Sequence, residues 1–201
     1  MSWSVANFIK MNPKIKKELK EWGIWLVVMA LLYFSGGYVF LAAQMQKLIL
    51  ATGLMNASTE SKNIALANYD FSVVDLDGKE LHFSELKGKT VFINLWATWC
   101  PPCRAEMPSI ANLYEKMHQE VVFVMISSDQ EKDKLRKFAQ DYPFKVYQTN
   151  QLPSVYESSS IPTSFVISPK GEIVYKREGI ARYDTEEFIE FLKTTNSEGR
   201  H

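Results

Sequence analysis

The stretch LWATWCPPCRAEMP, from Leu95 to Pro108, decides the fold. It holds the only two cysteines of the chain, Cys100 and Cys103, which are separated by two prolines. The overlapping run from Val91 to Trp96, VFINLW, is apolar and has the length of a buried strand. The pattern after the first cysteine predicts a helix from Pro101 to His118. The cysteine pair therefore stands where a buried strand ends and a helix begins.

The neighbouring segments continue an α/β pattern. In the run from Phe71 to Phe83, Asp77-Gly78 separates two alternating stretches, which predicts a β-hairpin at the start of the domain. Val121 to Ile126 indicates a second buried strand. Gln130 to Tyr142 has the spacing of an amphipathic helix. The side chains that this helix should bury are Leu135, Phe138 and Ala139.

The C-terminal part predicts a second hairpin and a last helix. Thr163 to Ile167 and Glu172 to Arg177 flank a four-residue turn, Ser168-Pro169-Lys170-Gly171. Asp184 and Glu187 are expected to cap the last helix at its N-terminus. Its buried stripe should consist of Phe188, Ile189, Phe191 and Leu192. Together these elements predict one domain, residues 69–195, with a mixed central sheet flanked by helices, and a tail over 196–201.

Composition excludes several kinds of site. Lysine plus arginine and aspartate plus glutamate each total 23, so no basic face for nucleic acid is expected. Two cysteines can build neither a scaffold of several disulfides nor a four-cysteine zinc site. The three histidines, His82, His118 and His201, have no spacing that suggests a metal or a Cys–His nucleophile. The sequence therefore predicts no metal and no cofactor.

The N-terminal part predicts a membrane anchor. Trp22 to Ala43 carries no charge and matches the roughly 20 residues with which a helix spans a bilayer. Residues 1–21 form a basic arm, whereas the predicted tether, residues 44–68, offers only Lys47 near the span. This bias puts the N-terminus in the cytoplasm and the domain outside, in a single-pass protein of the bacterial cytoplasmic membrane. A cleaved signal peptide fits less well, because the apolar run exceeds the usual length of about 7–15 residues.

The stretch from Leu95 to Pro108 resembles the thioredoxin superfamily, and within it the membrane-tethered TlpA/ResA-like thiol-disulfide oxidoreductases. Besides the CxxC pair, the resemblance rests on Pro108, where such helices kink, and on Ile161-Pro162-Thr163 before a later strand. It extends over about Phe71 to Leu192 and implies a thioredoxin-like fold. It also implies a reductase that takes electrons from a membrane thiol-disulfide carrier and passes them to oxidised protein thiols, with apocytochrome c among the expected targets.

The cysteines have distinct expected roles. The positive end of a helix stabilises a thiolate, so Cys100 should be the exposed nucleophile. Cys103 is predicted to be the resolving thiol that attacks the mixed disulfide. Because Pro101 and Pro102 lack an N–H, Cys103 and Arg104 are the first donors able to reach the thiolate. Modest stabilisation of the thiolate shifts the pair toward a reductant.

Glu106 lies one helical turn beyond Cys103, so its carboxylate can approach the same cavity. The resemblance links the matching glutamate to thiol protonation, and we expect Glu106 to accept the proton of Cys103. On spacing alone, an ordinary solvated glutamate is the alternative. Asn94 departs from the pattern of many thioredoxins, which have a buried aspartate at that place.

The resemblance also implies residues that bind the substrate. Pro162 matches the cis-proline that faces the cysteine pair, with a trans proline as the alternative, and the backbone of Ile161 can then pair with an extended substrate segment. Trp99 can present an apolar surface to a partner, beside Pro101 and Pro102. Trp96 is expected in the core.

Three other functions remain open at this point. An envelope oxidase or isomerase is one, although the roughly 50 residues between Pro108 and Pro162 are filled by two helices and a strand and leave no room for a large insertion. A thiol peroxidase is the second; Thr98 fits its pattern, but Phe92 stands at the matching proline position. The third is a non-enzymatic tethered binding module, whose cysteines merely hold the start of the helix in a structural disulfide.

Overall fold

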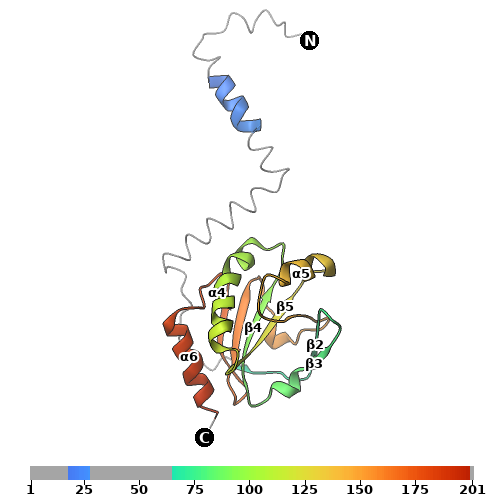
Figure 1. Cartoon of the computed structure of the whole chain (residues 1–201), viewed down its shortest axis with the longest axis vertical. Helices are drawn as coiled ribbons and strands as arrows, with labels where there is room; N and C mark the ends of the chain where they lie inside the picture. Colours follow the sequence, from blue (N-terminus) through green and yellow to red (C-terminus); the bar gives the residue numbers. More distant parts are fainter. Residues whose placement is uncertain (1–17, 28–64, 200–201) are drawn as a thin grey trace, which may run out of the picture. The chain divides into compact units, whose positions relative to one another are not determined.

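A computed structural model describes residues 18–27 and 65–199 (Figure 1). Residues 18–27 form a helix, and residues 65–199 form a folded domain. Within these described ranges, no helix is long and apolar enough to cross a membrane. The predicted span, Trp22 to Ala43, lies outside the described residues beyond Val27. So do most of the basic arm and of the tether, and the end of the tail with His201.

The domain is built on one mixed sheet of eight strands in the order β1-β8-β7-β4-β5-β6-β2-β3. The neighbours β4, β5 and β6 are parallel, and all other pairs are antiparallel. The strands are β1 (Ala65–Leu66), β2 (Ser72–Asp75), β3 (Glu80–His82), β4 (Thr90–Trp96), β5 (Val121–Ser127), β6 (Val146–Gln148), β7 (Thr163–Ile167) and β8 (Glu172–Glu178). The predicted mixed sheet is confirmed.

Three α-helices and two short 3-10 helices accompany the sheet. They are η1 (Phe83–Leu86), α4 (Pro101–Met117), α5 (Lys132–Ala139), η2 (Ser154–Tyr156) and α6 (Glu186–Ser197). Figure 1 shows α4 and α6 along the same side of the sheet. The hydrophobic cluster on that side contains residues from α4, α5 and α6, so these helices share one core. A second cluster on the other face includes η1 and η2.

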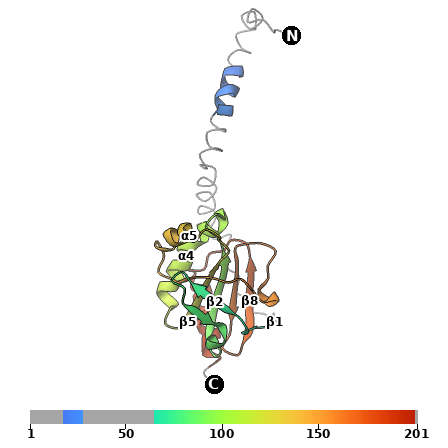
Figure 2. The same ribbon diagram turned by 90° about the vertical axis from the view of Figure 1, so that its right-hand side faces the viewer.

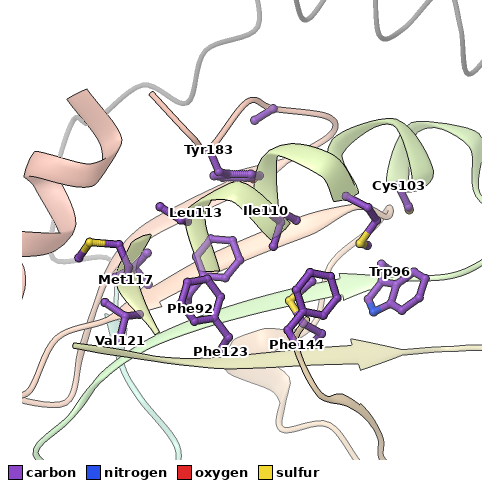
Figure 3. Close-up of a cluster of buried hydrophobic side chains, with 14 of the residues drawn as sticks. Phe92, Trp96, Cys103, Ile110, Leu113, Met117, Val121, Phe123, Phe144 and Tyr183 are labelled. Carbon is purple, nitrogen blue, oxygen red and sulfur yellow. The ribbon is translucent and has the colours of Figure 1, made fainter. Parts of the chain in front are cut away.

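The central strand β4 is covered by hydrophobic side chains on both faces of the sheet. All seven of its residues are buried, as expected for a strand with neighbours on both sides and cover on both faces. Phe92 and Trp96 point to the α4 side, whereas Val91, Ile93 and Leu95 belong to the other cluster. Figure 3 shows side chains of α4 lying over those of β4 and β5. Because α4 begins at Pro101, shortly after β4 ends at Trp96, the N-terminus of α4 lies near the carboxyl end of this buried strand.

Most predicted elements are confirmed, with two shortfalls. The first hairpin pairs β2 with β3, and Gly78 adopts the positive φ of 85° that its turn needs. The helix predicted from Gln130 to Tyr142 is real but shorter, because Glu131 is extended at its start and Pro143 disfavours helix at the preceding residue. Strand β6 was not predicted in the segment before Pro162, where two helices and one strand had been expected.

The two ends of the domain also differ from the sequence expectation. Ala65 and Leu66, the first described residues of the predicted tether, pair with the start of β8 at the sheet edge (Figure 2). The N-cap of α6 is Thr185, whose Oγ1 accepts the N–H of Phe188 at 3.3 Å. The predicted cap residue Asp184 instead accepts hydrogen bonds from Asn112 and Arg182.

Candidate active site

The cysteine pair lies at the N-terminus of α4. Cys100 is the N-cap residue, and it forms a disulfide with Cys103. Pro101 and Pro102 occupy the first two helical positions, where the lack of an N–H costs least. The N–H of Cys103 donates to the Sγ of Cys100 at 3.3 Å. The N–H of Arg104, the second predicted donor, bonds instead to the carbonyl of Cys100 at 3.1 Å. A single backbone N–H therefore contacts Cys100 Sγ at the helix start.

The two cysteines are less exposed than expected. Cys100 is 4% exposed and Cys103 is fully buried. Cys100 is thus the more accessible of the two, but the prediction of an exposed Cys100 is wrong for the disulfide form, because the loop before Pro162 packs against it. The carbonyl oxygen of Ile161 lies 3.8 Å from Cys100 Sγ.

The predicted substrate-binding residues gather around this disulfide. The peptide bond between Ile161 and Pro162 is cis, so the trans alternative is wrong. Pro162 is buried, whereas Pro101, Pro102 and Ile161 are half-buried. Trp99, the residue before Cys100, is 65% exposed. An apolar rim therefore borders Cys100, the less deeply buried of the two cysteines.

Trp96 lies in the core, as predicted. It is buried, and its ring packs against Phe138 of α5 with 5.4 Å between the centroids. In Figure 3 it lies below Cys103, at one end of the cluster between α4 and the sheet.

Glu106 is not an ordinary solvated glutamate. It is fully buried in α4, one turn beyond the equally buried Cys103. Its Oε1 accepts a hydrogen bond from Asn94 Nδ2 at 2.8 Å, and its Oε2 accepts one from the N–H of Ala181 at 3.2 Å. Burial raises the pKa of Glu106 from 4.5 to about 8, while these two hydrogen bonds and the charge of Arg177 act in the opposite direction. A carboxyl group with such a pKa can gain or lose a proton near neutral pH.

Asn94 connects Glu106 to the sheet. It lies in β4, fully buried, and its Nδ2 also donates to Ser164 Oγ of β7 at 2.9 Å. An amide holds the carboxylate without adding a second titrating group. Asn94, which stands where many thioredoxins have a buried aspartate, is therefore a neutral partner for Glu106.

A second polar group near the cysteines escaped the sequence analysis. Asp129, just after β5, accepts hydrogen bonds from the N–H and the Oγ1 of Thr98, at 2.8 Å and 2.5 Å. Thr98 lies two residues before Cys100. The signal that could have found the contact is topological, because the carboxyl ends of parallel neighbours such as β4 and β5 meet at one edge of the sheet.

The two histidines that the structure describes, His82 and His118, lie apart from this site. His82 and His118 are exposed, and each bonds to a nearby residue: His82 to Ser72 Oγ and His118 to the carbonyl of Tyr114. Among the residues that the structure describes, no group of histidine, cysteine, aspartate or glutamate side chains could hold a metal ion.

Comparison with known proteins identifies the family. Residues 65–176 match the model of the AhpC/TSA family, which is more than half of the chain. The thiol-disulfide oxidoreductase ResA of Bacillus anthracis is 34% identical over 143 residues, covering 68% of this chain and 81% of the relative. ResA of Bacillus subtilis (strain 168) is 36% identical over 110 residues, covering 52% of this chain and 62% of the relative.

Solved structures agree with this result. A thiol:disulfide interchange protein of the thioredoxin family from Chlorobium tepidum TLS superposes with a TM-score of 0.53 and 27% identity, covering 66% of this chain and 97% of its own. The predicted thioredoxin-like fold is therefore confirmed. The described domain, with its Cys100–Cys103 disulfide, belongs to the AhpC/TSA family of thioredoxin-like proteins, and it is a thiol-disulfide oxidoreductase of the ResA type.

Proposed function

We propose that this oxidoreductase reduces protein disulfides on the outer side of the bacterial cytoplasmic membrane, with apocytochrome c among its substrates and a membrane thiol-disulfide carrier as its electron donor. The uncharged run from Trp22 to Ala43, with the basic arm before it, supports the anchor and its orientation. A tether of this kind would raise the effective concentration of the domain near membrane-bound donors and acceptors.

The proposal that the enzyme is a reductant rests on one observation, that a single backbone N–H donates to Cys100 Sγ. Donors at a helix N-terminus stabilise a thiolate, and a more stabilised thiolate makes the pair more oxidising. At this helix, Pro101 and Pro102 have no N–H to offer, and that of Arg104 is engaged by a carbonyl. Cys103 alone donates. The reduced form is thus weakly stabilised, and electrons flow readily from it to another disulfide.

The proposed reaction balances as a two-electron exchange. The thiolate of Cys100 attacks one sulfur of the substrate disulfide, forms a mixed disulfide and releases the first substrate thiolate, which takes a proton from water. Cys103 loses its proton to the carboxylate of Glu106 and attacks Cys100 Sγ. The second substrate thiolate leaves, and the Cys100–Cys103 disulfide remains. The substrate has gained two electrons, which the carrier later restores to the enzyme.

Glu106 suits the proton-acceptor step because its raised pKa, about 8, lies near that of an ordinary thiol. The proton therefore moves between groups of similar affinity, which is the condition for efficient acid–base catalysis. The apolar rim formed by Trp99, Pro101, Pro102 and Ile161 would hold the substrate segment, with the Ile161 backbone as a pairing partner.

The reduction potential of the Cys100–Cys103 pair tests the direction of electron flow. We would equilibrate the full-length protein, in detergent micelles, with defined mixtures of reduced and oxidised glutathione or dithiothreitol. A potential near or below about −270 mV supports a reductase, whereas one near about −120 mV identifies an oxidase and overturns the proposal.

A variant checks the physical reason for that potential. Pro102 occupies the second helical position, from which an N–H commonly donates to an N-cap side chain. Pro102→Ala would supply this missing donor and should raise the potential by about 30 mV, the equivalent of about 1.4 kcal/mol. Pro169→Ala, in the turn between β7 and β8, is the matched control and should leave the potential unchanged. An unaltered potential in Pro102→Ala would show that N–H donors do not set it.

The same structure argues against a peroxidase. The hydroxyl of Thr98, the one residue that fitted the peroxide-site pattern, donates to Asp129 rather than toward a molecule bound at Cys100. Peroxide consumption by the reduced protein, followed in solution, should therefore be slow compared with reduction of a protein disulfide.

A further inference from the structure

We propose that Asp129 is a positioning residue, which acts through Thr98 to hold the turn that presents Trp99 to a protein substrate. The inference rests on the proposed function, because only a protein disulfide would use this docking surface. Asp129 lies outside the disulfide, outside the apolar rim and outside the network around Glu106.

The contact joins two segments that are 31 residues apart in the chain. Asp129 Oδ2 accepts the N–H of Thr98 at 2.8 Å, and its Oδ1 accepts the Thr98 hydroxyl at 2.5 Å. Next to this pair, the N–H of Ser128 donates to the carbonyl of Trp96 at 3.0 Å. The end of β4 and the start of the cysteine loop are thereby fixed to the segment after β5.

Asp129 is itself held in place. The residue is only 6% exposed, and its Oδ2 also accepts the hydroxyl of Ser127 at 2.7 Å. Its own N–H donates to Ser127 Oγ at 3.0 Å, and its carbonyl accepts Gln148 Nε2 of β6 at 2.5 Å. A buried carboxylate is costly unless donors surround it, so this one depends on Thr98 for two of its bonds.

The two bonds determine the shape of the turn before the disulfide. The N–H of Cys100 closes the turn by donating to the carbonyl of Ala97 at 3.2 Å. Between these residues, Thr98 faces inward to Asp129, and Trp99 is left on the surface. Because the N–H and the hydroxyl of Thr98 are both bonded to Asp129, the backbone of the turn is held, and with it the position from which the Trp99 side chain projects.

This arrangement predicts an effect on substrate docking more than on bond exchange. The disulfide is held by α4 and by the loop at Ile161, whereas the hydrogen bonds of Asp129 go to Thr98, Ser127 and Gln148. Loosening the turn should let the Trp99 ring leave its docking position while Cys100 stays at the helix start. The Michaelis constant for a protein disulfide should therefore change more than kcat.

The test measures reduction of insulin by the full-length reduced protein. Thr98→Val removes the hydroxyl and retains the shape, so KM for insulin should rise by about fivefold or more while kcat stays within about twofold of wild type. Thr98→Ser restores the hydroxyl and should restore KM. Asp129→Asn, which weakens the same bonds from the other side, should raise KM in the same sense.

Thr149→Val is the matched control. Thr149 is also half-buried, and its hydroxyl donates to the carbonyl of Ser72, away from the cysteines. The control should keep the wild-type KM, even if its melting temperature falls as far as that of Thr98→Val.

Three results would overturn the inference. KM in Thr98→Val could equal that of wild type, Thr149→Val could raise KM equally, or Thr98→Ser could fail to restore it. A wild-type protein that reduces oxidised glutathione but not insulin would instead overturn the proposed function, and the positioning role would fail with it. Comparing wild type on both substrates before the variants keeps the two failures apart.

Discussion

Replacing Glu106 with glutamine should flatten the pH dependence of the free energy of unfolding. The pKa of this buried carboxyl is raised from 4.5 to about 8, chiefly by burial. Between these values the native state holds a proton that the unfolded chain has released, so stability falls as the pH rises. The stabilising effect of protonated Glu106 is complete below the unfolded pKa and is lost as the pH rises through this window. Glutamine has no proton to release.

The magnitude follows from the two pKa values. With 4.5 for the unfolded chain and about 8 for the native state, Glu106 should lower the free energy of unfolding by about 2–3 kcal/mol between about pH 5 and about pH 7. Glutamine itself costs something at every pH, because Asn94 and Ala181 both donate to position 106 and the Nε2 group would face one of them. That cost, about 1–3 kcal/mol, does not depend on pH. The change with pH is therefore the quantity to compare.

Urea denaturation of the oxidised protein at several pH values measures it, since other titrating groups contribute equally to wild type and variant. Glu115→Gln, an exposed position on the same helix, is the control and should keep the wild-type pH dependence. The reasoning would be refuted if wild type and Glu106→Gln lost stability in parallel from about pH 5 to about pH 7.

Three further predictions test other parts of the structure. Cys103→Ser should trap the substrate as a mixed disulfide on Cys100, visible by mass spectrometry, whereas Cys100→Ser should trap none because Cys103 is fully buried. Trp96→Ala should lower the free energy of unfolding by about 3–5 kcal/mol in urea denaturation, and Trp99→Ala, at an exposed position, by less than about 1 kcal/mol. Thr185→Ala removes the N-cap of α6 and should cost about 1 kcal/mol, seen as a lower melting temperature.

The elements nearest the cysteines could be predicted because the local signals agree. Strand β4 is apolar at five of its seven positions, and Pro101 and Pro102 stand where a helix tolerates them. Segments as long as β4 and α4 show their hydrophobic pattern in the sequence itself. Strands β1 and β6, of two and three residues, are too short to show any period. They are defined only by pairing, β1 with β8 and β6 with β5 and β2.

The site was predictable only where it is local or shared with the family. Spacing from Cys103 located Glu106, and the resemblance supplied its chemistry. Its burial and its pairing with Asn94 are tertiary facts, because β4 and α4 bring the two residues together. The contact between Thr98 and Asp129 spans 31 residues and depends on the order of strands in the sheet. The order of the strands in the sheet cannot be read from the composition or the periodicity of the sequence.

The pairing of β1 with β8 bears on how the domain avoids self-association. An unpaired sheet edge is a template for pairing with a strand of another molecule. Here β1 pairs with the first residues of β8, including the apolar Ile173. The other half of β8 carries the exposed ion pair between Lys176 and Glu178. A shortened version beginning after Leu66 would uncover Ile173 and should aggregate more readily. The folded unit therefore begins no later than Ala65.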